Sequence, residues 1–270
     1  MFKRVIVAVV CLPILLWVFY IAPPIVLPIA VSLLSMVGVH EVLWSTGFVK
    51  NSMISGLSIL LSGVVPFWVY IGQGMRSALV GIFLYFLLMF LIAISSHYTV
   101  TMEKMGGSFF FAMLIPYFLS TFVRLDALPM GKYLILIPLV AAFSSDIFAL
   151  FGGMAFGKHK LAPELSPKKT VEGAISGWIG SIGCCLIYGV VMQYVFQLEV
   201  NYFCLFLYGF LGGPISQVGD LSFSYIKRQY GLKDFGNIFP GHGGVLDRFD
   251  SVIFCAPLIE ILIRWLPALG

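Results

Sequence analysis

The stretch YLILIPLVAAFSSDIFALFGGMAF, residues 133–156, contains a single charged residue, Asp146. A membrane-spanning helix needs about 20 mostly apolar residues, so this stretch is long and apolar enough to cross a bilayer. A carboxylate near the bilayer centre costs about 2.5–3.5 kcal/mol even on a lenient scale, so Asp146 must face a cavity, a polar partner or a cation. The stretch therefore predicts a membrane protein with a polar site among its helices.

Similar apolar runs recur along the chain, which has 270 residues, 60% of them hydrophobic, and a mean hydropathy of +1.02. The first run follows Lys3 and Arg4 as a signal peptide would, but no small-residue cleavage site follows it, so we expect a retained helix. Alternatively, residues 5–39 form a re-entrant hairpin or one broken helix. We predict an all-α, polytopic integral membrane protein with about nine transmembrane helices, at residues 5–21, 25–39, 53–72, 78–95, 108–123, 133–156, 172–197, 202–226 and 251–268.

The placement of the cations predicts the orientation of these helices. With the N-terminus inside, all but four of the 16 lysine and arginine residues fall on the cytoplasmic side, as the positive-inside rule requires. We therefore expect the protein to be integral to the cell (inner) membrane, with its active site facing the cytoplasm. The five cysteines lie in apolar runs without a C-x-x-C pair, which indicates packing and neither zinc nor disulfides.

The ionisable residues are distributed unevenly between the two halves of the chain. Residues 1–132 carry few of them and predict transmembrane scaffold helices, with His40 and Glu41 interpreted as interfacial residues at the end of a span. Residues 133–270 predict the catalytic region, with cytoplasmic loops at 157–171 and 227–250. Nothing in this pattern indicates a nucleic-acid partner.

Acidic residues in the second half have spacings that bring them together. Asp220, Ser224 and Lys227 are spaced i, i+4, i+7 and share one helix face. Asp247 and Asp250 are three residues apart at the start of the last helix, where each also suits an N-cap role. Converging carboxylates beside cations suit a hard divalent ion, most simply Mg²⁺. The candidate metal ligands are Asp146, Asp220, Asp247 and Asp250.

The lysines of loop 157–171 have two interpretations. They satisfy the positive-inside rule or bind anionic head groups, or the loop forms a phosphate cradle just before a helix. The cradle would consist of Ser166, Lys168, Lys169 and Thr170. Gly152-x4-Gly157-Lys158 looks like a P-loop, but His159 stands where the magnesium-binding hydroxyl should be.

A second polar segment, Pro240-Gly241-His242-Gly243-Gly244, has a backbone able to approach a phosphate closely. For His242 three roles stay open: general acid or base, hydrogen-bond donor to a phosphate, and surface residue. Glu260 and Arg264, spaced i and i+4 in the last helix, predict a structural ion pair.

Residues 224–250, in the order S-x-x-K-R-x4-K-D-x-G-x3-P-G-H-G-G-x2-D-R-F-D, closely resemble the signature of the phosphatidate cytidylyltransferase (CDP-diacylglycerol synthase) family. Residues 146–173 are similar to a second block of that family, and the resemblance covers residues 140–255. Phe223 stands where the family often has an acid, so we place no metal ligand there. Ile147 and Phe148 replace a common small-residue and glycine pair.

The resemblance implies that a phosphate oxygen of phosphatidic acid attacks the α-phosphorus of CTP, giving CDP-diacylglycerol and pyrophosphate. It implies Mg²⁺, with a second metal ion as an option. Asp220 and Asp247 are the leading candidates for the metal ligands, and Asp250 and Asp146 are the next candidates. The chain's size is compatible with a homodimer among membrane lipids. The catalytic residues would be Asp220, Asp247, Lys227 and His242, and the substrate-binding residues Ser166, Lys168, Lys169, Thr170, Ser224, Arg228, Lys233, Asp234, Gly243, Gly244 and Arg248.

Two other functions are compatible with intramembrane acids. A secondary transporter also places acids on membrane helices, but it predicts related halves with broken helices at corresponding positions. A CTP-dependent kinase acting on a polyprenol would transfer the γ-phosphate of CTP instead of the cytidylyl group. The product that carries the cytosine distinguishes the kinase from the transferase.

Overall fold

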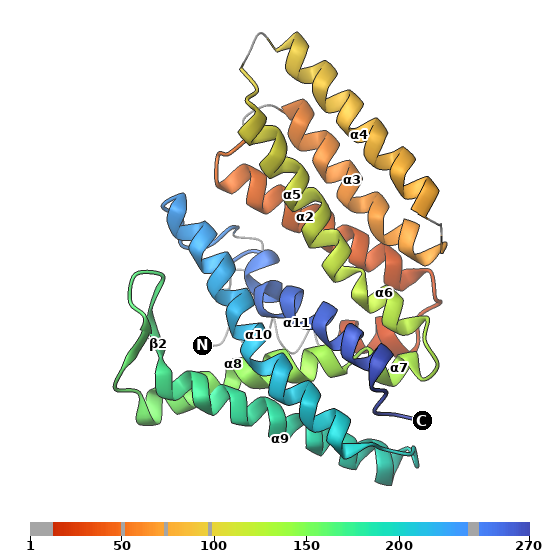
Figure 1. The fold of residues 1–270 in the computed structure, drawn as a ribbon, viewed down its shortest axis with the longest axis vertical. Coiled ribbons are helices and arrows are strands. Elements are labelled where there is room, and N and C mark those ends of the chain that lie inside the picture. The colour runs from red at the N-terminus through yellow and green to blue at the C-terminus, as the bar shows by residue number, and fades with distance from the viewer. Residues whose placement is uncertain (1–12, 50–51, 73–74, 97–98, 237–242) are drawn as a thin grey trace. The chain divides into compact units, whose positions relative to one another are not determined.

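The computed structural model describes residues 13–49, 52–72, 75–96, 99–236 and 243–270 (Figure 1). The chain forms two compact units. The first consists of residues 1–124 and 234–248, and the second of residues 125–233 and 249–270. Nearly all of the regular structure is helical, which confirms the all-α prediction. The functional division proposed at residue 132 stays a prediction.

The first unit is a bundle of long apolar helices. Helix α2 packs against α3 and α5, and α4 lies against α3 (Figure 1). Thr101 caps α5 because its hydroxyl accepts a hydrogen bond from the Lys104 amide at 3.4 Å. Residues 13–20 are also helical. The bounds are α2 Val26–Ser45, α3 Ser52–Tyr70, α4 Met75–Ser95 and α5 Met102–Leu119.

The second unit packs α8, α9 and α10 against one another. Small residues allow this close contact: a Cβ on Gly209 of α10 would lie 2.5 Å from the Ile182 Cα of α9. Thr170 and Asn201 cap α9 and α10 through their side-chain oxygens. The division between the units falls within α6 and α11. The bounds are α6 Thr121–Asp126, α7 Gly131–Leu134, α8 Ile137–Phe156, α9 Val171–Val195, α10 Tyr202–Gln229 and α11 Leu246–Trp265.

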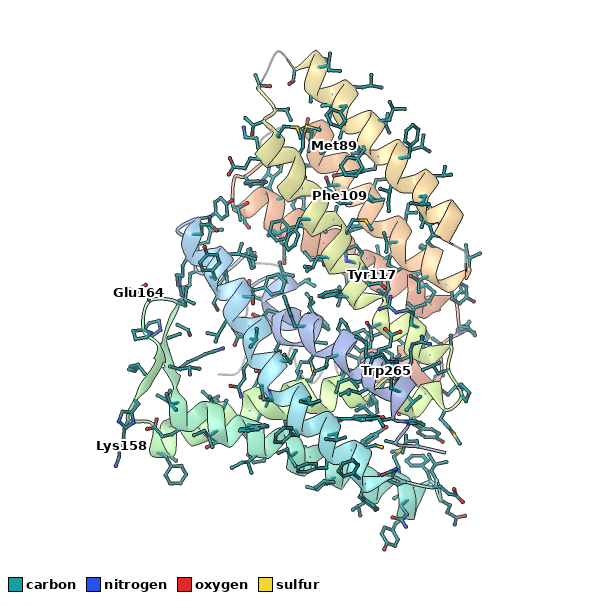
Figure 2. The ribbon with its side chains drawn as sticks, viewed as in Figure 1. Met89, Phe109, Tyr117, Lys158, Glu164 and Trp265 are labelled. Atoms are coloured by element: carbon teal, nitrogen blue, oxygen red, sulfur yellow. The ribbon has the colours of Figure 1, made fainter. Side chains whose placement is uncertain are left out.

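The segment predicted as a polar loop at 157–171 contains a small antiparallel hairpin, formed by β1 (Lys160–Ala162) and β2 (Ser166–Thr170). Figure 2 shows Glu164 at its turn and Lys158 at its base. Strands of three and five residues without β-branched alternation give almost no sequence signal. The hairpin connects two helices of membrane-spanning length.

Six of the described helical stretches are long and apolar enough to cross a membrane. They lie at Val26–Ser45, Ser52–Tyr70, Ala78–Ser95, Met102–Asp126, Gly131–Phe156 and Val171–Val195. The predicted count of nine is therefore not confirmed. Residues 5–12 of the first predicted span lie outside the described residues, and α10 and α11 carry several of the charged residues of the candidate site.

Candidate functional site

Helix α10 presents an acid, a hydroxyl and a cation along one face. The Ser224 hydroxyl donates a hydrogen bond to the Asp220 carboxylate at 3.3 Å, and Lys227 lies one turn further on. The Lys227 ammonium is 3.9 Å from the Asp250 carboxylate, and both residues are buried. The structure thus brings together three groups that the spacing predicted and adds Asp250 to them.

The hairpin contributes a second ammonium group to this face. The Lys169 ammonium on β2 is 2.5 Å from the Asp220 carboxylate, and both side chains are about one-quarter exposed. Arg228 ties α10 to the hairpin, because its Nε donates to the Leu165 carbonyl at 3.1 Å. Thr170 is the N-cap of α9, where its hydroxyl accepts a hydrogen bond from the Gly173 amide at 3.1 Å.

Asp146 joins the same group of side chains from α8. It accepts a hydrogen bond at 2.8 Å from the Ser251 hydroxyl, and Asp250 interacts electrostatically with Asp146, Asp220 and Lys227. Three carboxylates and two ammonium groups are therefore concentrated in the second unit. We call this set the lysine-paired cluster; its members are Asp146, Lys169, Asp220, Ser224, Lys227, Asp250 and Ser251.

Asp247, in the first turn of α11, has a different environment in the first unit. One of its carboxylate oxygens accepts hydrogen bonds from the Phe235 amide at 2.8 Å and the Gly244 amide at 2.9 Å, and the residue is 7% exposed. These bonds connect the Asp247 carboxylate to the backbone that precedes α11. Helix α11 begins at Leu246, so the N-cap alternative is wrong for both Asp247 and Asp250. Asp250 lies in the second turn instead.

Glu41 of α2, interpreted from sequence as an interfacial residue, binds backbone amides inside the first unit. It is 4% exposed, and its two carboxylate oxygens accept hydrogen bonds from the Val245 amide at 2.9 Å and the Leu246 amide at 2.8 Å. Sequence reasoning missed this role because the partners are about 200 residues away. The available signal was an acid at the end of an apolar span.

The glycines beside Asp247 are confined by these carboxylates. Gly243 adopts a φ of +84°, which a residue with a side chain adopts only with strain. A Cβ on Gly244 would lie 2.4 Å from both carboxylate oxygens of Glu41. The sequence suggested that a phosphate could approach this backbone closely. At Gly244, the space next to the backbone is instead occupied by the Glu41 carboxylate.

The remaining predicted site residues differ in their exposure to solvent. Ser166 is half-buried, and Lys168, Lys233, Asp234 and Arg248 are exposed. His242 lies outside the described residues. The predicted ion pair of Glu260 and Arg264 is confirmed at 3.0 Å.

The P-loop-like segment holds an internal anion. The amides of Lys158 and His159 donate to the Glu172 carboxylate at 3.0 and 3.2 Å, and the His159 ring contacts it at 2.6 Å. In a P-loop such amides would bind phosphate. Their use here agrees with the rejection of that motif.

The carboxylates of the site can be compared with the ligands that the predicted Mg²⁺ would need. Among the described residues no three His, Cys, Asp or Glu side chains are close enough to hold an ion without further ligands. Mg²⁺ commonly uses one or two carboxylates and completes its shell with water and substrate phosphates. The paired carboxylates of the lysine-paired cluster fit that requirement.

Known proteins similar to this chain agree with the signature. The model of the cytidylyltransferase family matches residues 2–266. A phosphatidate cytidylyltransferase of Rickettsia bellii is 39% identical over 65% of this chain and 78% of its own length. Proteins of the same name from Bacillus subtilis and Staphylococcus haemolyticus are 39% and 43% identical over 61% and 49% of this chain. The aligned segments span only 60% and 50% of those two relatives.

Proposed function

This chain belongs to the cytidylyltransferase family and is therefore an enzyme, and we propose that it converts CTP and phosphatidic acid into CDP-diacylglycerol and pyrophosphate in phospholipid biosynthesis. The observation that carries the proposal is a pair of lysine–carboxylate contacts, Lys169 with Asp220 and Lys227 with Asp250. They occur in a chain that also has six helical stretches long and apolar enough to cross a membrane among its described residues. Such a site suits a reaction between two anions, one of them a lipid.

The chemistry requires charge neutralisation more than a protein nucleophile. A phosphate oxygen of phosphatidic acid attacks the α-phosphorus of CTP, the bond to the β-phosphate oxygen breaks, and pyrophosphate leaves. Lys227 and Arg228 at the end of α10, with Lys169 on the hairpin, would suppress repulsion between the two substrates and stabilise the charge that develops on the transferring group. Lys168, Lys233 and Arg248 are further cations for the phosphates, and His242 is a further donor.

Asp220 and Asp250, with Asp146, are the carboxylates of the second unit that would hold Mg²⁺, which when bound supplies additional neutralisation of phosphate charge. Asp247 is the corresponding candidate in the first unit. A carboxylate has about four acceptor positions, so its two amide bonds do not by themselves exhaust it. Lys169 would then exchange its carboxylate partner for a substrate phosphate.

The substrates reach the enzyme from different phases. Phosphatidic acid would enter laterally from the bilayer, whereas CTP would arrive from the cytoplasm, which is the side that the positive-inside rule gives to the hairpin. The enzyme would therefore work at the inner face of the cell membrane. Homodimer formation remains part of this proposal and is tested by the mass of the protein in detergent.

The test of this function follows a label in the cytosine base of CTP. Purified protein in detergent is mixed with phosphatidic acid, Mg²⁺ and labelled CTP, and the organic phase is sampled over time. We expect the label to enter lipid and pyrophosphate to appear in equal amount, with EDTA blocking both. Label that remains in water as CDP would indicate the lipid kinase, and unchanged CTP with an intact protein would rule out both enzymes.

A further inference from the structure

We propose that Glu41 of α2 is a positioning residue for the signature segment: it fixes the backbone of residues 243–246 and thereby sets the position of the Asp247 carboxylate. The proposal rests on the proposed function for its effect on catalysis, but its structural part stands on the contacts of the first unit alone. Glu41 lies in the half of the sequence without a recognisable motif.

Glu41 binds the segment with both carboxylate oxygens. One oxygen accepts from the Val245 amide at 2.9 Å and the other from the Leu246 amide at 2.8 Å. These amides stand at the beginning of α11, where backbone N–H groups have no partner within the helix. The positive end of the helix dipole favours an anion there. A buried carboxylate from another helix supplies it.

The neighbouring Asp247 completes the arrangement. Its carboxylate accepts from the Gly244 and Phe235 amides, so three consecutive amides, those of Gly244, Val245 and Leu246, are directed at two acidic side chains. The two carboxylates also repel each other electrostatically. Loss of Glu41 would leave the Val245 and Leu246 amides without this acceptor, and the backbone at Asp247 could then move.

The glycines of the signature are shaped to this contact. A Cβ on Gly236 would lie 2.6 Å from a Glu41 oxygen, and one on Gly244 would lie 2.4 Å from both. Side chains at these two positions would displace the Glu41 carboxylate. The close contact of Glu41 with this backbone therefore depends on glycine at positions 236 and 244.

The most informative variant is Glu41→Gln. It keeps the shape of the side chain, but its NH₂ group cannot accept a hydrogen bond, so one of the two amides loses its partner. The matched control is Glu103→Gln, the same change at an exposed acid of α5 in the same unit. Both variants are compared with wild type by hydrogen exchange of peptides covering residues 243–248 and by steady-state kinetics.

For Glu41→Gln we expect amide exchange in residues 243–248 to accelerate about tenfold. We expect kcat to fall by up to about 100-fold, because a misplaced catalytic group costs rate even when its chemistry is intact. KM for CTP and phosphatidic acid should stay at wild-type values. Glu103→Gln should match wild type in both measurements.

Unchanged exchange in Glu41→Gln would overturn the contact itself. Faster exchange with wild-type kcat would leave the contact but overturn its role in positioning. If the wild-type protein transfers no label from CTP to lipid, the proposed function fails, while the exchange measurement still decides whether Glu41 fixes the segment. Glu41→Asp keeps the charge but shortens the side chain. Because the proposed role depends on geometry, we expect its kcat to stay below that of wild type, and a wild-type kcat would contradict that role.

Discussion

The two sets of acidic residues differ in what they bind. In the second unit, Asp220 and Asp250 face the ammonium groups of Lys169 and Lys227. In the first unit, Glu41 and Asp247 face backbone amides and lie almost entirely inside the protein. An ammonium on a flexible side chain can move to a substrate phosphate, whereas a backbone amide in a folded segment cannot. Asp220 and Asp250 are therefore suited to exchange partners with a substrate, whereas Glu41 is suited to hold the backbone that carries Asp247.

The largest effect should come from Asp220→Asn, because it removes a charge from the lysine-paired cluster. We expect turnover to fall at least about 100- to 1,000-fold, the range seen when one electrostatic contact to a transition state is lost. The melting temperature in detergent should remain near that of wild type. The exposed Glu164→Gln at the hairpin turn serves as the control. Substantial residual turnover in Asp220→Asn would remove this residue from the chemistry.

A smaller effect is expected for Lys169→Ala. The lysine would contribute a charged hydrogen bond of about 1.5–3 kcal/mol to a phosphate, so the KM of one substrate should rise about tenfold or more. Lys160→Ala, at an exposed lysine of the other hairpin strand, is the matched control. If both variants keep wild-type KM and kcat, the hairpin lysines only satisfy the positive-inside rule.

The contact between Glu41 and Gly244 can be tested by a double-mutant cycle on unfolding. Gly244→Ala alone should destabilise the protein, because its methyl group overlaps the Glu41 carboxylate. In a Glu41→Ala background the same change meets an emptied space, so the two effects should be non-additive by about 1 kcal/mol or more. Additive losses of stability would show that Gly244 is required for another reason, such as the approach of a phosphate.

The smallest effect is expected at His159, whose ring contacts Glu172 outside both sets of acids. The side chain is 79% exposed, and exposed ion pairs contribute little. Turnover of His159→Ala should stay within about twofold of wild type. A large loss would extend the site to the base of the hairpin, and would weaken the distinction between the two sets.

Much of the architecture could be predicted from local sequence, because apolar length and spacing are local properties. The helix carrying Asp146 follows from the apolar length of its stretch, and the shared face of Asp220, Ser224 and Lys227 follows from helical periodicity. The short hairpin did not follow, since its strands are brief and lack a β pattern. At its base, Glu172 accepts hydrogen bonds from amides 13 and 14 residues away.

The roles within the site were harder to predict than its members. Asp247 and Asp250 look alike in sequence, yet in the structure Asp247 accepts from two amides before α11, whereas Asp250 accepts from the Ser251 amide and faces Lys227. Glu41 had no motif to mark it, because its contact depends on the tertiary arrangement of α2 and the start of α11. Long-range hydrogen bonds to backbone amides leave no spacing pattern.

The most direct measurement applies two readouts, label transfer from CTP to lipid and hydrogen exchange of residues 243–248, to Asp220→Asn and Glu41→Gln in parallel. We expect Asp220→Asn to lose label transfer while its exchange stays at the wild-type rate, and Glu41→Gln to accelerate exchange as its kcat falls. Wild-type transfer by Asp220→Asn would contradict its role in the chemistry, and wild-type exchange in Glu41→Gln would contradict its role in holding the backbone.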